Sequence, residues 1–292
     1  ARMSVATLAR RLKVARSTIQ ARLERLESSG VIAGYTVKLG EAARDRSSAK
    51  RVAVTGSVGK TSTKEALAVC LAASGRTHRS VKSYNNHWGV PLTMSRMPRD
   101  SQFAVFEIGM NHRGEILPLT QLVKPHAAII TTIAPAHVEN LGSLEAVADE
   151  KGDIYAGLEP GGAAIVPNEA PHASRLIAAA ERNGANLIRF GRDQVCEARL
   201  IKFDMDETGS NAEAEILGRT IRYRVGVEGA HWALNSVASL AAADVVGADL
   251  VARLDQVVLV VQCRARADDA HLPCQYVVDL RQLVQARLAQ EG

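Results

Sequence analysis

The chain has 292 residues, of which 47% are hydrophobic and 23% are charged, a composition that excludes disordered, collagen-like and disulfide-stapled chains. At roughly 100–200 residues per domain, this length predicts two or three domains. No apolar run approaches the ~18–20 residues that span a bilayer, and residues 1–10 lack the apolar core of a signal peptide. Four irregularly spaced cysteines are typical of reduced thiols, so we expect a cytoplasmic protein.

The formal net charge of +5 is unevenly distributed along the chain. Residues 1–50 carry 11 Lys or Arg and 4 Asp or Glu, whereas the remainder carries 25 against 27. A basic head on a nearly neutral body favours a polyanion contact within the first fifty residues. Charge alone favours the simpler alternative, a solvated basic helix face, so the pattern of residues has to decide.

Two short helices and a hairpin are predicted at the start of the chain. Apolar residues at helical spacing predict helices over Ser4–Leu12 and Arg16–Ser29, joined by the link Lys13–Ala15. Gly30 is expected to end the second helix. The rough alternation of Val31–Leu39 is typical of a small β-hairpin. Two helices, a tight turn and a hairpin form a winged helix-turn-helix pattern.

The second of these helices would enter a DNA major groove. Its candidate contacts are Arg16, Ser17, Thr18, Gln20 and Arg22. The run LARRLKVARSTIQARLERLESSGVIAGYTVKL resembles the DNA-binding head of the Lrp/AsnC family of transcription regulators. The first helix of such a head would precede Ala1, and no effector-binding sandwich follows. We therefore expect a partial head over residues 1–43 with weak DNA binding, and a polar linker over 44–50.

The body of the chain begins with a phosphate-binding pattern. Arg51–Thr55 is a β-branched strand, followed by Gly56-Ser57-Val58-Gly59-Lys60-Thr61 and a helical stretch to about Ser74. Glycines in such a turn let backbone N–H groups point at phosphate oxygens, the lysine reaches the β/γ-phosphates and the threonine offers its hydroxyl to Mg²⁺. Val54 stands where the strict Walker spacing has a glycine. The simpler alternative is a glycine-rich β–α turn with an exposed lysine.

Strands and helices alternate downstream of this turn. The predicted buried strands are Phe103–Ile108, Ala127–Ile133 and Ala163–Val166, and the predicted helices are Glu115–Val123, Leu144–Leu158 and His172–Asn183. This order predicts an α/β fold with a mostly parallel sheet and helices on both faces. The expected core residues are Ala53, Val54, Val105, Ile129 and Ile130. Residues 195–228 predict antiparallel hairpins attached to that sheet. The tail, 251–292, has a β-like run at 254–266 and an amphipathic helix pattern at 276–290.

Three side chains that could bind a ligand or a metal ion lie at the end of a predicted strand or in the segment that follows one. Thr61, Glu107 and His137 would meet outside the carboxyl ends of a parallel sheet, where ligands gather in such folds. Taken singly, a glutamate at a strand end is usually solvated and a histidine in a loop usually binds nothing. Convergence beside a phosphate-binding turn favours a functional role for all three.

The body resembles the Mur ligase family over about residues 51–250. The resemblance rests on TGSVGKTSTKE, NNHWGVPLT, FEIGMNHRGEI, IAPAHVENLGSLEAVADEKGDI and GAHWALNSVASLAAA, in the family's order. The second and third of these motifs are most similar to the branch that adds D-alanyl-D-alanine to a UDP-N-acetylmuramoyl tripeptide. The resemblance implies that ATP lies on the residues Gly56, Ser57, Val58, Gly59, Lys60 and Thr61, with His231 and Asn235 on the adenine side.

The same resemblance implies a role for further side chains. Thr61 and Glu107 would hold one Mg²⁺ ion, and His137 would help to hold a second. Lys151 matches a lysine that is carbamylated in many family members, although sequence alone reads it as an exposed helix lysine. Asn85 and Asn86 match the segment that faces the muramoyl-peptide substrate. Lys60, Lys151 and His137 are thus the expected catalytic residues.

The implied activity is an ATP-dependent amide ligase of cell-wall precursor synthesis that works through an acyl phosphate. Its substrates would be a UDP-MurNAc-tripeptide and D-Ala-D-Ala, with ATP and Mg²⁺. Family members also have an N-terminal uridine-nucleotide domain and a C-terminal Rossmann-like domain, which are not recognised in this sequence, so impaired ligation is expected. The alternative is a DNA-binding regulator with a nucleotide-binding body.

Overall fold

The computed structural model describes residues 5–31, 48–136, 138–206, 209–226 and 229–249, together with the backbone of three short strands at 258–259, 262–264 and 275–277. The chain divides into two compact units, residues 1–39 and 40–292. Each unit is described by itself.

The first unit contains two helices, α1 (Val5–Leu12) and α2 (Arg16–Ser28), as the sequence predicts. Ala9 and Ile19 are buried between them, whereas the Leu12 side chain is 57% exposed. Gly30 follows α2 with φ of +73°, which confirms its expected place after the helix. The predicted hairpin over 31–39, Val31 apart, and Ser4, the first residue of the predicted first helix, lie outside the described residues.

Ten strands of the described part of the second unit form one sheet. In sheet order they are β10 (Val258–Leu259), β9 (Arg219–Val225), β8 (Gly209–Ile216), β7 (Ala198–Asp206), β6 (Asn186–Gly191), β5 (Ala163–Pro167), β4 (Ala127–Ile130), β1 (Lys50–Thr55), β3 (Phe103–Glu107) and β2 (Thr77–Arg79). All neighbours from β2 to β7 pair in parallel. The expected core residues are fully buried in this sheet, which confirms the predicted α/β core: Ala53, Val54, Val105, Ile129 and Ile130.

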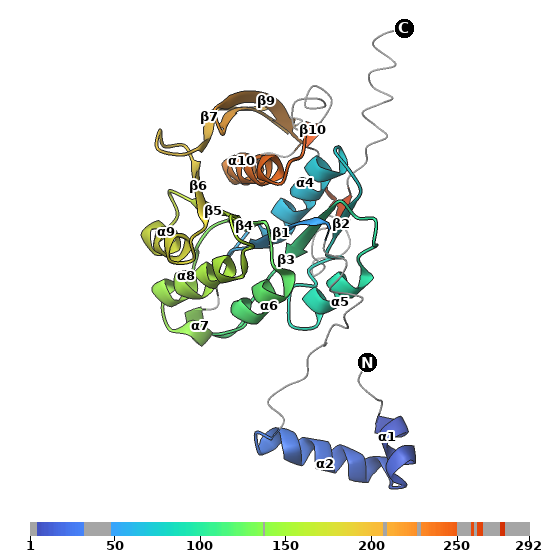
Figure 1. The fold of residues 1–292 in the computed structure, drawn as a ribbon. Coiled ribbons are helices and arrows are strands. Elements are labelled where there is room, and N and C mark those ends of the chain that lie inside the picture. Colours follow the sequence, from blue (N-terminus) through green and yellow to red (C-terminus); the bar gives the residue numbers. More distant parts are fainter. Residues whose placement is uncertain are drawn as a thin grey trace. The chain divides into compact units, whose positions relative to one another are not determined.

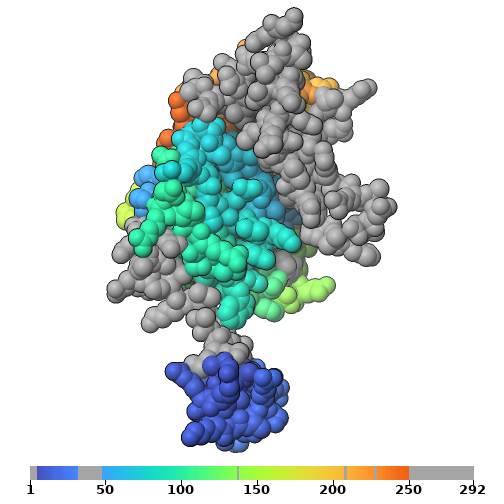
Figure 2. All heavy atoms as spheres, turned by 90° about the vertical axis from the view of Figure 1, so that its right-hand side faces the viewer, coloured from blue at the N-terminus to red at the C-terminus, as the bar shows by residue number. Residues whose placement is uncertain are grey.

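Helices cover both faces of the sheet (Figure 1). One face carries α4 (Lys60–Ala72) and α10 (Ala230–Val245), and the other carries α5 (Gly89–Arg96), α6 (Ile116–Val123), α8 (Leu144–Gly152) and α9 (Ala173–Arg182). Successive strand residues point to opposite faces. Val52 and Val54 therefore join the cluster under α4 and α10, while Ala53 points to the opposite face. Seen from the side, residues of α4, β2 and α5 form one continuous surface of this unit (Figure 2).

Two predicted elements have different bounds in the structure. The helix expected over 144–158 is α8 followed by a 3₁₀ turn at Asp153–Gly157, with the one-turn helix α7 (Val138–Leu141) before it. The strand expected to reach Ile133 ends at Ile130. Because it ends there, the following residues are free to bend toward the phosphate-binding turn.

The hairpins predicted over 195–228 are present. β7 pairs with β8 and β8 with β9, all antiparallel, and β7 attaches them to the parallel sheet. The predicted helix over 276–290 is wrong at its start, because residues 276 and 277 belong to β12 (Gln275–Val277), which pairs antiparallel with β11 (Gln262–Arg264). The rest of that range lies outside the described residues. No helix in the described part of the chain is both long and apolar enough to cross a bilayer.

Candidate functional site

The turn between β1 and α4 requires its two glycines. Gly56 has φ of +145° and Gly59 has φ of +85°, a region that disfavours other residues. A Cβ at Gly56 would collide with the Thr131 hydroxyl, and one at Gly59 would lie 2.6 Å from Asn235 Nδ2. The turn is therefore packed closely between the end of β4 and the first part of α10.

Side chains around the turn fix its path. The backbone N–H of Ser57 donates to the Thr132 carbonyl at 2.9 Å. Its hydroxyl donates to the Ala134 carbonyl at 3.0 Å and accepts from the Ala134 N–H at 2.9 Å. Thr131 Oγ1 donates to the Val58 carbonyl at 2.5 Å, while the Val58 side chain is 60% exposed. Both the backbone N–H and the side chain of Ser57 thus anchor the turn, and its contact with a nucleotide stays a prediction.

Lys60 begins α4 and folds over the turn. Its Nζ donates to the carbonyls of Gly56 at 2.8 Å and Ser57 at 3.3 Å. Burial lowers the pKa of Lys60, and the negative charge of Glu107 partly opposes that shift. The ammonium group and the free N–H groups at the start of α4 together form an anion-binding environment.

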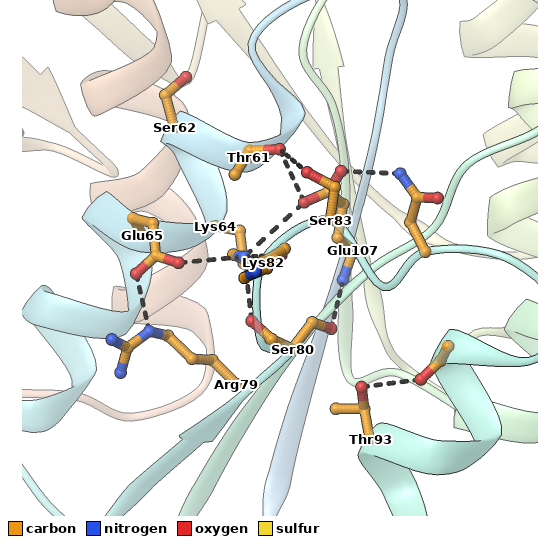
Figure 3. Close-up of polar contacts among 12 residues, drawn as sticks. Thr61, Ser62, Lys64, Glu65, Arg79, Ser80, Lys82, Ser83, Thr93 and Glu107 are labelled. Atoms are coloured by element: carbon orange, nitrogen blue, oxygen red, sulfur yellow. Dashed lines mark hydrogen bonds and ion pairs between the residues drawn. The ribbon is translucent and has the colours of Figure 1, made fainter. Parts of the chain in front are cut away.

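Thr61 and Glu107 meet directly beside this turn (Figure 3). Thr61 Oγ1 donates to Glu107 Oε2 at 2.9 Å and lies 3.1 Å from Ser83 Oγ. Asn85 Nδ2 donates to Glu107 Oε1 at 2.9 Å, and the Glu107 residue is only 1% exposed. Two of the three side chains predicted to converge, Thr61 and Glu107, are therefore in contact.

The donor set suits magnesium better than a transition metal. Among the described residues, no three His, Cys, Asp or Glu side chains cluster as a metal site. A hydroxyl and one carboxylate, Thr61 and Glu107, are instead hard oxygen ligands. Mg²⁺ is usually bound by one or two carboxylates together with substrate phosphates and water. The residues present therefore fit a magnesium ion shared with a phosphate ligand.

A buried lysine that the sequence analysis did not single out supports Glu107 (Figure 3). The Lys64 side chain is fully buried one helical turn after Thr61. Its Nζ donates to the carbonyls of Ser80 at 3.0 Å and Lys82 at 2.5 Å. It also lies 3.0 Å from Glu65 Oε1 and 3.8 Å from Glu107 Oε2. Lys64 thereby joins α4 to the segment that leads from β2 to Asn85.

Lys151 is buried at the end of α8, so the interpretation from sequence alone, an exposed helix lysine, is wrong. It is 1% exposed, and burial lowers the pKa of Lys151 to about 7, with the charge of Lys60 acting in the same direction and Glu150 opposing. Glu150 itself accepts hydrogen bonds from the N–H groups of Gly114 at 2.8 Å and Ile116 at 3.1 Å. A substantial fraction of Lys151 is thus a neutral amine near neutral pH.

We expect the stability of the chain to reveal this shifted pKa. The ordinary lysine pKa is about 10.4, so between pH 7 and about pH 10 the unfolded state binds more protons than the folded state. The free energy of unfolding should therefore rise with pH, by up to about 1.4 kcal/mol per unit. The Lys151→Met variant should lack this rise when both proteins are unfolded with urea in CO₂-free buffer. An identical pH dependence in the two proteins would contradict the shift.

A cavity of about 330 Å³ lies beside the turn. His231 and Asn235, predicted on the adenine side, are both among its walls. The lining residues are Val58, Gly59, Thr131, Thr132, Pro167, Glu169, Ala170, Pro171, Phe190, Gly191, His231, Leu234 and Asn235. Its largely apolar walls with a few polar groups are typical of a small-molecule site.

Asn85 and Asn86 occupy an exposed segment before α5. Asn85 is bonded to Glu107, whereas Asn86 Oδ1 accepts from the N–H groups of Trp88 at 3.1 Å and Gly89 at 2.9 Å. The side chains of Tyr84 and Trp88 are 42% and 40% exposed. The structure thus shows a local stabilising role for both asparagines, and their contact with substrate stays a prediction.

The structure brings Lys60, Thr61, Glu107 and Asn85 together around one turn, and it places His231 and Asn235 at the adjoining cavity. Lys151 is close enough for the charge of Lys60 to affect its pKa. His137 lies outside the described residues. The sequence analysis missed Lys64, Ser83, Thr131 and Glu169. The sequence signal for Lys64 was its position one helical turn after Thr61, which places both side chains on the same face of α4.

Comparisons with known proteins agree with this geometry. The family described as Mur ligase middle domain matches residues 54–243, and that of winged helix-turn-helix DNA-binding matches 1–33. The UDP-N-acetylmuramoyl-tripeptide–D-alanyl-D-alanine ligase of Rickettsia prowazekii is 34% identical over 209 residues, which are 71% of this chain and 46% of the relative. The Escherichia coli enzyme of that name is 44% identical over 123 residues, 42% of this chain and 27% of the relative.

A solved structure supports the fold. The crystal structure of MurF from Acinetobacter baumannii superimposes with a TM-score of 0.67 at 30% identity, covering 71% of this chain and 46% of that one. The chain therefore spans about half the length of the Rickettsia ligase and of the Acinetobacter MurF chain.

Proposed function

The chain belongs to the Mur ligase family through its middle domain, and from that premise we propose that residues 51–249 bind Mg-ATP and pass its γ-phosphoryl group to a carboxylate. The observation that carries the proposal is the contact of Thr61 Oγ1 with Glu107 Oε2, at 2.9 Å, beside a glycine turn that begins a helix. Hydroxyl, carboxylate, lysine and free N–H groups in one place are the parts that phosphoryl transfer requires.

The triphosphate would lie over the turn. The Lys60 ammonium would leave its present contacts with the carbonyls of Gly56 and Ser57 and bind phosphate oxygens together with backbone N–H groups of residues 56–61. His231 and Asn235 would meet the nucleoside in the cavity of about 330 Å³. Gly59 keeps that cavity continuous with the turn, because a side chain there would meet Asn235.

Thr61 and Glu107 would hold the metal ion, and His137 would help to hold a second one. When bound, magnesium neutralises charge on the transferring phosphoryl group. Before the ion binds, Lys64 and Asn85 keep the Glu107 carboxylate oriented toward Thr61. The metal-holding groups are therefore preorganised by the protein.

The acceptor would be the terminal carboxylate of a UDP-MurNAc-tripeptide, and the second substrate D-Ala-D-Ala. The carboxylate oxygen attacks the γ-phosphorus, ADP leaves, and an acyl phosphate forms. The amine of D-Ala-D-Ala then attacks the acyl carbon, loses a proton, and phosphate leaves as the amide forms. Negative charge grows on oxygen atoms in both steps, and Lys60 with the turn N–H groups would stabilise it.

Lys151 and the asparagine segment would complete the site. The pKa of Lys151, lowered to about 7 mainly by burial, provides a neutral amine that can add CO₂, and the resulting carbamate would supply an anion beside the metal ions. Asn85 and Asn86, in the exposed segment before α5, would face the muramoyl peptide.

Nucleotide titrations of the wild-type chain and of Glu107→Gln test this proposal. Mg²⁺ should strengthen ATP binding to the wild-type chain, and Glu107→Gln should lose roughly tenfold or more of that strengthening, because a neutral amide is a weaker ligand for the ion. The amide oxygen can still accept from Thr61, but the amide nitrogen would face the Asn85 group that now donates to Oε1, so a thermal melt checks that the variant keeps its fold. Glu181→Gln, on the exposed surface of α9, is the matched control. Failure of the wild-type chain to bind ATP, or an unchanged metal dependence in Glu107→Gln, would refute the proposal.

A second proposed activity is DNA binding by the first unit. It is supported by the match of residues 1–33 to a DNA-binding family and by the exposure of Arg16, Gln20 and Arg22 on α2. Affinity for duplex DNA should fall linearly with salt on logarithmic axes. Neutralising Arg16 and Arg22 with glutamine should reduce that slope by about 0.9 for each phosphate that the variant no longer neutralises. Lys60→Met, in the other unit, is the control; an unchanged slope in the arginine variants would exclude this surface.

A further inference from the structure

The cavity beside the turn extends across four neighbouring strand ends. Gly59 follows β1, Thr132 follows β4, Pro167 ends β5 and Gly191 ends β6, and these strands are consecutive in the sheet. Neighbouring strands are about 4.8 Å apart, so the two ends of the cavity are separated by roughly 14 Å. That span is comparable with the distance from a nucleotide's phosphates to the far edge of its purine. The wall at β5 and β6 is therefore where the edge of a base would arrive.

Glu169 stands in that far wall with one oxygen fixed. Its Oε1 accepts the backbone N–H of Arg192 in a very short contact and that of Asp193 at 3.1 Å. Its carboxylate lies against Gly191, where a Cβ would collide with it. Within the described part of the chain, no hydrogen bond to Oε2 is present. One oxygen is thus tied to the turn after β6, and the other is left as an acceptor for a ligand.

At the β5 and β6 end of the cavity, opposite the turn, Glu169 is the side chain that can hydrogen-bond the edge of a base. Pro167, Pro171 and Phe190 are apolar at this end and can pack against a ring but cannot distinguish hydrogen-bonding groups. Of the described residues that line the cavity, Glu169 is the only carboxylate. A carboxylate accepts hydrogen bonds and, when ionised, donates none.

We propose that Glu169 selects adenine over 6-oxopurines by accepting a hydrogen bond from the exocyclic amine of the base. The inference rests on the proposed binding of ATP and adds the residue that reads the base. Adenine presents an N–H donor at this position, whereas hypoxanthine and guanine present a carbonyl oxygen. Two acceptors that face each other form no hydrogen bond and repel. The pocket therefore favours adenine by a hydrogen bond and disfavours a 6-oxopurine by repulsion.

The Glu169→Gln variant is expected to reverse the hydrogen-bonding character of the group that faces the base. The amide oxygen can keep the N–H groups of Arg192 and Asp193, so the amide nitrogen is presented in place of Oε2. An acceptor is thereby exchanged for a donor at nearly constant shape. Glu169 is exposed at the rim of the cavity, so the exchange leaves the core intact.

The experiment is competition of ATP and inosine triphosphate against a fluorescent ATP analogue, with Mg²⁺ present. The wild-type chain should bind ATP at least about tenfold more tightly than inosine triphosphate, the effect of one discriminating hydrogen bond. Glu169→Gln should bring the ratio to unity or invert it, and Glu169→Ala should reduce it without inversion. Glu181→Gln should keep the wild-type ratio, and a thermal melt of each protein checks the fold.

Two failures can be told apart. If the wild-type chain binds ATP but shows no preference, or Glu169→Gln keeps the wild-type ratio, the role of Glu169 is refuted while the proposed nucleotide binding stands. If the wild-type chain binds neither nucleotide, the proposed function fails and the inference fails with it.

Discussion

Replacing Lys60 with methionine is expected to weaken the binding of Mg-ATP by about a hundredfold, equivalent to ~2.7 kcal/mol. Lys60 Nζ lies 2.8 Å from the Gly56 carbonyl, over the turn that would receive the phosphates. Its ammonium would exchange contacts with neutral carbonyls for charge-assisted contacts with phosphate oxygens, which are roughly twice as strong. Isothermal titration with a non-hydrolysable ATP analogue measures the change.

Lys202→Met is the matched control for this substitution. The Lys202 side chain is 68% exposed on β7, where it pairs with Asp204, and solvent screens such an exposed pair. We expect the control to bind Mg-ATP as the wild-type chain does. Equal affinity of Lys60→Met and wild type would show that the triphosphate does not lie on this turn.

Replacing Lys64 with methionine is expected to lower the free energy of unfolding by about 3–5 kcal/mol, the usual effect of removing one partner of a buried ion pair. The Lys64 side chain is fully buried and touches Glu65, Glu107 and two backbone carbonyls. Methionine fills a similar volume but leaves both carbonyls without a donor. At this size, the melting temperature should fall by roughly 10 °C.

Denaturant unfolding of Lys64→Met and of Lys202→Met, measured in parallel, distinguishes the loss of buried contacts from the loss of a positive charge. The Lys202 variant loses the same charge at an exposed place, so its stability should stay close to that of the wild-type chain. If Lys64→Met is as stable as the control, the Lys64 contacts do not support the Glu107 site. The effect of Lys64→Met should be concentrated in the segment from Ser80 to Asn85, where hydrogen exchange should accelerate.

The parallel sheet could be predicted from the sequence because its central strands are short apolar runs. FAVFE, AAII and AAIVP are buried on both faces, so they read as strands without alternation. β2 escaped prediction since THR has no apolar pattern and forms the edge of the sheet. α5 escaped because GVPLTMSR begins with glycine and carries a proline in its first turn. The Asn86 side chain supplies the acceptor that starts it.

Without the family resemblance, the candidate site could be predicted only where residues stand at or just after strand ends along one edge of the sheet. Thr61 and Glu107 are such residues, and the parallel topology alone brings them together. Lys64 could not be found in this way, because a lysine on a helix is usually solvated. Its burial depends on the segment 80–82 returning across α4, a tertiary contact. Glu169 likewise matters only because β5 and β6 end side by side.

A crystal structure of the chain with Mg²⁺ and a non-hydrolysable ATP analogue tests the central claim most directly. We predict a magnesium ion bound by Thr61 Oγ1 and Glu107, phosphates on the N–H groups of residues 56–61, and the base in the cavity between β5, β6 and α10. Phosphates bound elsewhere, or the Thr61–Glu107 hydrogen bond unchanged with no ion beside it, would contradict the account.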